Sequence, residues 1–296
     1  MKTVDRNSFW VRARRHMVIK FSRLISDKKY LEEIFPALVG YPLNLDDPQS
    51  FNEKIQWLKL HDRKEIYSKM VDKAEAKKIV ASIIGEEYIN PTLCLYDRIE
   101  DIDFDQLPNQ FVLKCTHDSG GIVICNDKTK LDKTAALKKL NYFFHRKYFW
   151  YNREWPYKNV KPRILAERYL VDESGWQLKD YKVFCFNGDP KFIEVDYDRY
   201  VNHKLNVYDL HWNYIDFYMT SHNDPNVKIE KPKKLDLMLD LCRKISKDIT
   251  FLRVDFYSIG DKLYFGELTF HPGSGFIQFH PKEYDWKLGE MLNLKN

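Results

Sequence analysis

Two carboxylates near the C-terminus lie at positions that could hold a metal ion. Asp255 lies in a β-like run over residues 251–257, and Glu267 lies in a second run over residues 263–270, after a short glycine-containing turn. Side chains alternate between the two faces of a strand, so a three-residue loop would place Asp255 opposite Glu267 on one face. A two-residue turn would place Glu267 on the other face.

The three-residue register would also place Arg253 opposite Thr269, beside the two carboxylates. Opposed carboxylates repel unless a cation lies between them. Carboxylate oxygens that hold a hard cation which also binds phosphates are typical of magnesium sites in ATP-using enzymes. Asp255, Glu267 and Thr269 are therefore candidate metal ligands. The alternative is that Arg253 neutralises the pair in a structural ion network.

A lysine followed by a glycine-rich loop forms a second candidate region. Lys114 lies in an apolar run over residues 111–116, where a lysine must reach solvent or meet an anion. Ser119, Gly120 and Gly121 follow, before another apolar run, and such a hairpin loop could cover nucleotide phosphates. The spacing is neither a Walker A loop nor a G-x-G-x-x-G turn. An edge strand with an exposed turn is the plainer alternative.

Composition restricts the class of protein. The 296 residues are 44% hydrophobic and 31% charged, which excludes bulk disorder. The longest run without Lys, Arg, Asp or Glu is residues 268–281, shorter than the ~20 residues of a membrane-spanning helix. Five dispersed cysteines without metal-binding spacing favour a reducing, cytoplasmic setting. Residues 1–29 carry nine Lys or Arg against two Asp, a net charge of +7, so the other residues sum to −2 and the basic character of the chain lies in this leader.

The elements expected around these residues mix helices with short strands. Residues 8–35 predict a basic amphipathic helix, which either lies on an anionic membrane surface or packs on the domain with its charged face in water. Further helices are expected over residues 51–60, 66–84, 131–148 and 235–249. Strands are expected over residues 111–116, 122–125, 164–169, 181–187, 192–197, 204–208, 251–257 and 263–270. This order predicts an α+β chain with antiparallel sheets.

Taken in order, these segments resemble an ATP-grasp enzyme and, more narrowly, the TupA-like ATP-grasp family, which is named for teichuronopeptide biosynthesis and found in bacterial polysaccharide gene clusters. The resemblance runs roughly from residue 35 to residue 288. It rests on an ordered set of segments: Phe51-Asn-Glu-Lys-Ile-Gln-Trp-Leu-Lys, Val71-Asp-Lys, Phe111-Val-Leu-Lys-Cys-Thr-His-Asp-Ser-Gly-Gly, Asp180-Tyr-Lys-Val-Phe-Cys-Phe-Asn-Gly, and Arg253-Val-Asp-Phe-Tyr with Phe265-Gly-Glu-Leu-Thr-Phe.

The resemblance implies an ATP-grasp fold, in which two α+β subdomains with antiparallel sheets clamp ATP after a helical N-terminal region. The charge and helical pattern place a basic helical leader and loop at residues 1–50 and a helical part at 51–110, where many ATP-grasp enzymes have an α/β domain. A subdomain with a glycine-rich lid would follow at 111–170, and one with the metal site at 171–296. ATP and Mg²⁺ would be the cofactors.

Roles for single residues are implied as well. Glu167 would accept a hydrogen bond from the adenine amino group, Tyr169 and Leu170 would supply hinge backbone, and Asp172 or Glu173 would hold the ribose. The implied nucleotide contacts are Lys73, Lys114, Ser119, Gly120, Gly121, Glu167, Tyr169, Leu170, Asp172 and Lys182. The implied metal ligands are Asp255, Glu267 and Thr269, with Thr269 in place of the asparagine of the superfamily's Glu-x-Asn motif. The implied catalytic cations are Arg253, Arg199 and Lys182.

The activity implied is an ATP-dependent carboxylate–amine ligase that works through an acyl phosphate. It would join an amine or amino acid to a uronic acid of a capsular or cell-wall polysaccharide, with a uronic-acid-containing saccharide or sugar nucleotide as the partner. The alternatives are an ATP-dependent kinase of a sugar hydroxyl and a glycosyltransferase-like protein of the same pathway. Nucleic acid is not expected as a partner, because the excess of basic over acidic residues is confined to residues 1–29, which would instead contact the inner face of the membrane.

Overall fold

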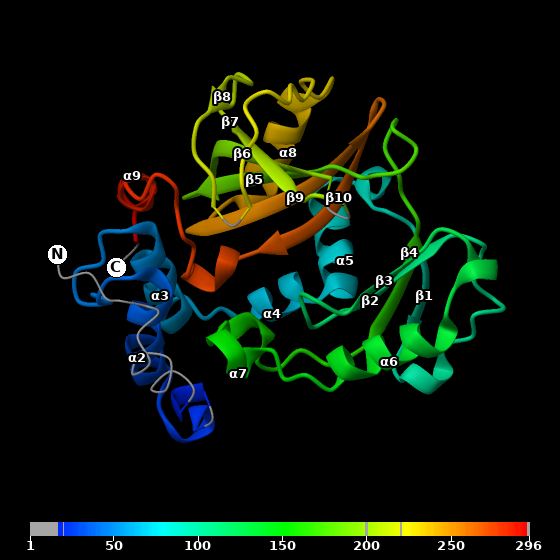
Figure 1. Ribbon diagram of the computed structural model, residues 1–296, viewed down its shortest axis with the longest axis horizontal. Helices are drawn as coiled ribbons and strands as arrows, with labels where there is room; N and C mark the ends of the chain where they lie inside the picture. The colour runs from blue at the N-terminus through cyan, green and yellow to red at the C-terminus, as the bar shows by residue number, and fades with distance from the viewer. Residues whose placement is uncertain (1–16, 20, 199–200, 220, 295–296) are drawn as a thin grey trace.

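Two β-sheets with helices around and between them make up the protein (Figure 1). The computed structural model describes residues 17–19, 21–198, 201–219 and 221–294. Every pairing between its strands is antiparallel, which confirms the expected α+β class. No helix in these described ranges has the length and apolar character needed to cross a bilayer.

The smaller sheet has the strand order β1-β4-β2-β3 and the larger one β10-β9-β5-β6-β7-β8. The strands of the smaller sheet are β1 (Thr92–Tyr96), β2 (Phe111–Cys115), β3 (Ile122–Cys125) and β4 (Ile164–Arg168). Those of the larger sheet are β5 (Asp180–Phe186), β6 (Asp189–Tyr197), β7 (Lys204–Tyr208), β8 (Tyr214–Ile215), β9 (Phe251–Ile259) and β10 (Lys262–Thr269). All eight expected strands are present, while β1 corrects the expectation that residues 51–110 are helical.

The helices are α2 (Asp27–Val39), α3 (Phe51–His61), α4 (Glu65–Val71), α5 (Lys73–Ile84), α6 (Lys133–Phe144), α7 (Phe149–Asn152), α8 (Leu235–Ser246) and α9 (Tyr284–Met291). The helix expected over residues 66–84 is in fact two helices. The chain breaks at Asp72, whose side chain accepts hydrogen bonds from the backbone N–H groups of Ala74 and Glu75 and so caps α5. Because of this break, Lys73 begins a helix instead of lying inside one.

The helix expected over residues 8–35 is interrupted in its described part: residues 17–19 and 27–35 are helical, but the segment between them is not a continuous helix. A single 3₁₀ turn, Ser22–Leu24, precedes Ser26, which caps α2 by accepting from the backbone N–H of Lys29. The helix α2 then continues through Pro36, where a loop is expected from the sequence, and ends at Gly40 in the left-handed conformation (φ 102°). Residues 8–16 lie outside the described part of the chain.

The two faces of the larger sheet are used differently. One face carries Val183, Val254 and Phe256, and it is covered by α8 together with residues of α4 and α5 in one apolar core. On the other face, Phe184 and Phe186 pack against α3 and α9 in a second core. This second face is apolar at only one end, and its other end carries the charged residues that build the site.

The contact between α3 and α9 positions that second core. The carboxylate of Asp285 in α9 accepts from the backbone N–H and the side-chain amide of Asn52 at 2.9 and 2.7 Å, and from the Tyr41 hydroxyl at 2.7 Å. Gly289 lies so close to the start of α3 that an added Cβ would be 2.1 Å from the carbonyl oxygen of Gln49. The two helices can approach this closely only because residue 289 has no side chain.

We expect Gly289→Ala to destabilise the fold although alanine is the better helix former. The clash with the backbone of α3 should cost about 1–3 kcal/mol, which lowers the melting temperature by several degrees in a chain of this size. Thermal unfolding followed by circular dichroism measures the effect, with the exposed neighbour Glu290→Ala as control. A Gly289→Ala variant as stable as that control would contradict this description of the α3–α9 contact.

Candidate active site

The hairpin of β9 and β10 decides whether Asp255 and Glu267 share a face. Its turn has two residues, Gly260 and Asp261, because Lys262 pairs with Ile259. With uniform pairing, this turn would place Glu267 and Asp255 on different faces of the sheet. The register shifts, however, between Phe265 and Leu268, and beyond the shift Leu268 pairs with Val254 and Thr269 pairs with Arg253.

This shift is a β-bulge in which Gly266 and Glu267 together lie opposite Asp255. A Cβ at Gly266 would be 3.1 Å from the carbonyl oxygen of Asp255, so the bulge is tight against the neighbouring strand. Without the bulge, Glu267 would lie beside Val254 on the face that is buried against α8. The bulge therefore restores the arrangement that the sequence predicts only for a three-residue loop.

Arg253 holds the two carboxylates together. Its Nε and Nη2 donate to the two oxygens of Asp255 at 2.7 and 2.6 Å, and Nη2 also donates to Oε1 of Glu267 at 3.0 Å. Burial, with the nearby Glu267 charge, raises the pKa of Asp255 to about 7 despite Arg253. The ion network that the sequence left open as an alternative is present, and the carboxylates are still in mutual repulsion.

Lys182 lies next to this network, on β5 directly opposite Asp255. Its Nζ donates to Glu194 at 2.8 Å and to Asp196 at 2.5 Å, and Nε2 of His203 is 3.1 Å from Asp196. Burial acts to lower the pKa of Lys182, but the two carboxylates outweigh it and the pKa is raised. Glu194 and Asp196 were not singled out from the sequence, although alternation along β6 places them on one face.

A second ion cluster lies on the smaller sheet. Glu167 of β4 receives Nζ of Lys114 from β2 at 2.6 Å and Nζ of Lys77 from α5 at 2.7 Å. Burial acts to raise the pKa of Glu167, but the two lysines outweigh it and lower the pKa to about 2. Both carboxylate oxygens thus face lysines. Lys77 was missed from the sequence, although it lies one helical turn after Lys73.

Lys73 and the glycine-rich loop are joined through Asp118. Nζ of Lys73 donates to the carbonyl oxygen of Asp118 at 2.7 Å, and the backbone N–H of Gly120 donates to its carboxylate at 2.8 Å. Arg146 pairs with the same carboxylate, with Nε at 2.6 Å from Oδ2. A Cβ at Gly121 would be 2.5 Å from Sγ of Cys115, so the loop requires a glycine there.

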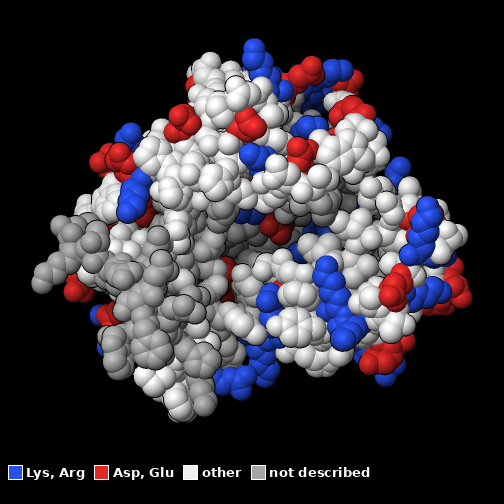
Figure 2. Space-filling view, in the orientation of Figure 1, with Lys and Arg blue, Asp and Glu red and all other residues white. Residues whose placement is uncertain are grey.

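The two clusters face a common cleft. Burial acts to raise the pKa of Glu267, but Lys73, Arg253, Lys114 and Lys182 outweigh it, and the pKa is lowered. Cations from both sheets therefore act on one carboxylate. Figure 2 shows a hollow in the middle of the face in view, with Asp or Glu atoms in its depth and Lys or Arg atoms nearby. Such a cleft suits a ligand that carries several negative charges.

The remaining predicted residues lie along the rim or outside the cluster. Tyr169 and Leu170 lie in the segment that leads from β4 of the smaller sheet to β5 of the larger one. Asp172 pairs with Lys179 at 2.7 Å and so closes its own turn. Ser119 is exposed in the glycine-rich loop. Arg199 lies outside the described residues.

A buried polar network supports the loop that follows β10. Nζ of Lys59 in α3 is fully enclosed and donates to the carbonyl oxygens of Ser274 and Asn152 at 2.6 and 2.8 Å. Burial lowers the pKa of Lys59 to about 7. Ser274 has a φ of 54° and its hydroxyl donates to Glu154 at 2.6 Å, while His271 lies 3.6 Å from the other oxygen of Glu154. This network fixes a strained loop beside the carboxylate strand.

The donors present fit a divalent cation. Asp255 and Glu267 are hard oxygen ligands brought together by the bulge, and the Thr269 hydroxyl lies on the same face. The Glu267 side chain is 41% exposed, so it is accessible from the cleft. Burial and, after it, repulsion from Glu267 raise the pKa of Asp255, and a cation there would relieve that repulsion.

Protonation of Glu167 should weaken the fold in acid. Lys114 and Lys77 lower its pKa from 4.5 to about 2 in the folded protein, so the unfolded chain binds more protons between these values. The free energy of unfolding therefore rises with pH from about 2 to about 4.5, and this contribution is lost as the pH falls through that range.

Urea unfolding of the wild type and Glu167→Gln over about pH 2–7 measures this effect. At neutral pH the variant should lose about 3 kcal/mol, because two buried lysines lose their counter-charge. Its stability should also fall less steeply between about pH 4.5 and pH 2 than that of the wild type or of the exposed control Glu230→Gln. Identical pH profiles for all three proteins would show that the ion cluster is not formed.

Comparison with solved structures gives matches of low sequence identity and low TM-score. A D-alanine–D-alanine ligase from Helicobacter pylori is 14% identical, with 83% of this chain and 70% of that chain covered and a TM-score of 0.43. A D-alanine–D-alanine ligase from Bacillus anthracis in complex with ATP is 15% identical, over 75% and 62% of the chains, with a TM-score of 0.41. The ATP-grasp ligase PsnB with a minimal precursor is 9% identical, over 70% and 54%, with a TM-score of 0.40.

A search of curated protein sequences found no match. The family comparison did: the sequence profile of TupA-like ATP-grasp proteins matches residues 53–293, which include both sheets and every described residue of the two ion clusters. The aligned segment covers most of the chain. The protein therefore belongs to the TupA-like ATP-grasp family.

Proposed function

We propose that the protein is an ATP-dependent carboxylate–amine ligase. Membership of an ATP-grasp family makes ATP its nucleotide and a ligase its class of enzyme. In the proposed reaction, a substrate carboxylate oxygen attacks the γ-phosphorus of ATP, the bond to the β–γ bridging oxygen breaks and ADP leaves. An amine then attacks the acyl carbon, phosphate leaves and the nitrogen loses a proton.

The observation that carries this proposal is that Lys73 and Lys114 act together on Glu267, whose pKa they help to lower, while Arg253 ties Glu267 to Asp255. The triphosphate of ATP brings several negative charges, and the lysines would neutralise them. The carboxylates would hold magnesium, which supplies further positive charge to the phosphates when bound. Phosphoryl transfer depends mostly on such positioning and electrostatic stabilisation.

Each region of the cleft has a proposed part. The loop with Gly120 and Gly121 would cover the phosphates, held in shape by Asp118, whose carboxylate accepts from the backbone N–H of Gly120. Arg253 would orient the two metal-binding carboxylates, since it already donates to both. Arg253, Lys182 and Arg199 are the cations proposed to act on the acyl phosphate.

We propose a uronic acid of a capsular or cell-wall polysaccharide as the source of the carboxylate, and an amine or amino acid as the acceptor. Support comes from the resemblance of the ordered motifs to a family of polysaccharide gene clusters. We propose a cytoplasmic location on the same grounds, with contact to the inner face of the membrane through residues 1–29. Their basic charge supports that contact.

We expect Mg-ATP to raise the melting temperature of the wild type. A ligand at about one hundred times its Kd stabilises the folded state by about 2.7 kcal/mol, or roughly 5–10 °C in a chain of this size. Glu267→Gln keeps the side-chain volume and removes the charge, so the part of the shift that depends on magnesium should disappear. The exposed Glu290→Gln is the matched control, and an equal magnesium-dependent shift in both variants would refute Glu267 as a ligand.

Phosphate release should distinguish the ligase from a kinase. With Mg-ATP and a uronic acid, a ligase releases phosphate when an amine is added and forms an amide, whereas a kinase forms a phosphorylated sugar and releases none. We expect amine-dependent phosphate release in a screen of uronic acids against amino acids, with mass spectrometry of the product. A phosphorylated saccharide formed without an amine would replace the ligase with the kinase.

A further inference from the structure

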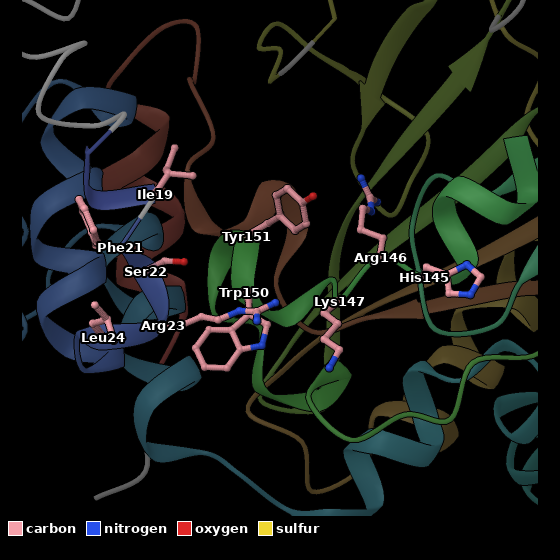
Figure 3. Close-up of a pocket in the computed structure, with 10 residues that line it drawn as sticks. All are labelled: Ile19, Phe21, Ser22, Arg23, Leu24, His145, Arg146, Lys147, Trp150 and Tyr151. Carbon is pink, nitrogen blue, oxygen red and sulfur yellow. The ribbon is translucent and has the colours of Figure 1, made fainter.

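A basic pocket lies between the N-terminal segment and the link from α6 to α7 (Figure 3). Its volume is about 480 Å³, within the range of pockets that bind small organic ligands. Figure 3 shows Arg23 beside the ring of Trp150 on one wall, with Arg146 and Lys147 on the side beyond Tyr151. Of its described lining residues, only Arg146 also belongs to the site described above.

The lining of the pocket has one sign of charge. Arg23, His145, Arg146 and Lys147 line it, and none of the described lining residues is acidic. Lys147 is exposed, and within the described part of the chain neither Lys147 nor Arg23 forms an ion pair with a carboxylate. Arg23 instead lies over the ring of Trp150, with Cζ 5.7 Å from the ring centroid. These charges match a ligand with carboxylate groups.

Two aromatic rings give the pocket a second property. Trp150 and Tyr151 lie side by side in sequence and both line it, with Arg23 and Arg153 over the ring of Trp150 and Arg146 over that of Tyr151. A sugar ring has an apolar C–H face and polar edges, which such a wall accommodates, since aromatic rings bury apolar area while neighbouring donors meet the polar groups. The combination favours an acidic saccharide over a small inorganic anion.

Arg146 connects this pocket to the glycine-rich loop. Its guanidinium lies 5.3 Å from the centroid of the Tyr151 ring and pairs with Asp118, which holds the backbone N–H of Gly120. Asp118 also accepts from Lys73 through its carbonyl oxygen. One side chain therefore spans the distance between a pocket ligand and the loop that we propose to cover the phosphates.

We propose that the pocket binds the flanking sugars of an acidic oligosaccharide whose reacting carboxylate lies in the cleft. The inference rests on the proposed function. A uronic acid polymer carries a carboxylate on every sugar, so one can react while its neighbours pair with Arg23 and Lys147. The pocket then selects a polymer over a single sugar acid. Arg146, which lines the pocket and pairs with Asp118 of the glycine-rich loop, positions the polymer relative to that loop.

The test is calorimetric titration of the full chain with trigalacturonate, without ATP. Its methyl ester has the same rings without the charges, and maltotriose is a neutral trisaccharide. Lys147→Glu should weaken trigalacturonate binding by about tenfold or more, as expected for loss of a charge-assisted contact. Lys139→Glu makes the same charge change at an exposed position of α6 outside the pocket, and should bind as the wild type does. Melting temperatures confirm that both variants fold.

Tight binding of trigalacturonate alone, lost in Lys147→Glu, supports the pocket. Absence of binding, equal binding of the ester, or equal loss in both variants overturns it. A third result would also overturn it: the wild type sediments with phosphatidylglycerol vesicles, Lys147→Glu does not, and trigalacturonate binds to neither protein. The basic residues of the pocket would then contact lipid. Mg-ATP shifts are measured on the same proteins: a shift without oligosaccharide binding refutes the pocket alone, and binding without any ATP-dependent product refutes the ligase alone.

Discussion

The site depends on one extra residue in β10. Because the turn between β9 and β10 has two residues, uniform pairing would bury Glu267 beside Val254 in the apolar core under α8. The bulge at Gly266 moves the carboxylate to the face of Asp255, where Arg253 meets both. Burying an uncompensated carboxylate in that core is costly, so the same shift that builds the site also protects the fold.

Ion compensation then governs which groups stay charged. Glu167 between Lys77 and Lys114 is held in its ionised form, since its pKa is lowered to about 2. The pKa of Asp255 is instead raised to about 7 by burial and by Glu267, so its carboxyl group titrates near neutral pH. The charge of Glu167 is therefore compensated by its two lysines. Asp255 and Glu267 still repel each other, and an added cation would reduce that repulsion. This contrast is the reason for proposing the cluster of Asp255 and Glu267, and not that of Glu167, as the cation site.

Helix α5 contacts both the smaller and the larger sheet. Its start is fixed by Asp72, which caps the helix and places Lys73 against the glycine-rich loop. One turn later Lys77 reaches Glu167 of the smaller sheet, and Val80 lies in the core of the larger one. The loop itself is held from the other side by Arg146. The loop and both sheets thus meet through this short helix and a few polar contacts.

Local pattern in the sequence determined every strand except β1 and β8, the antiparallel class and most of the charged candidates, because alternation and turn residues act over a few positions. The sequence also identified the family, because the order of the motifs along the chain can be recognised without knowing their positions in space. It could not decide the bulge at Gly266, which depends on the backbone of Asp255, or the partners of Lys182 on β6. Lys77 and Arg146 likewise escaped notice, since each meets a carboxylate far away in sequence. Only tertiary packing sets such contacts. The burial of a charged side chain and its distance from charges on other segments decide whether it is neutralised within the protein or left able to bind a ligand.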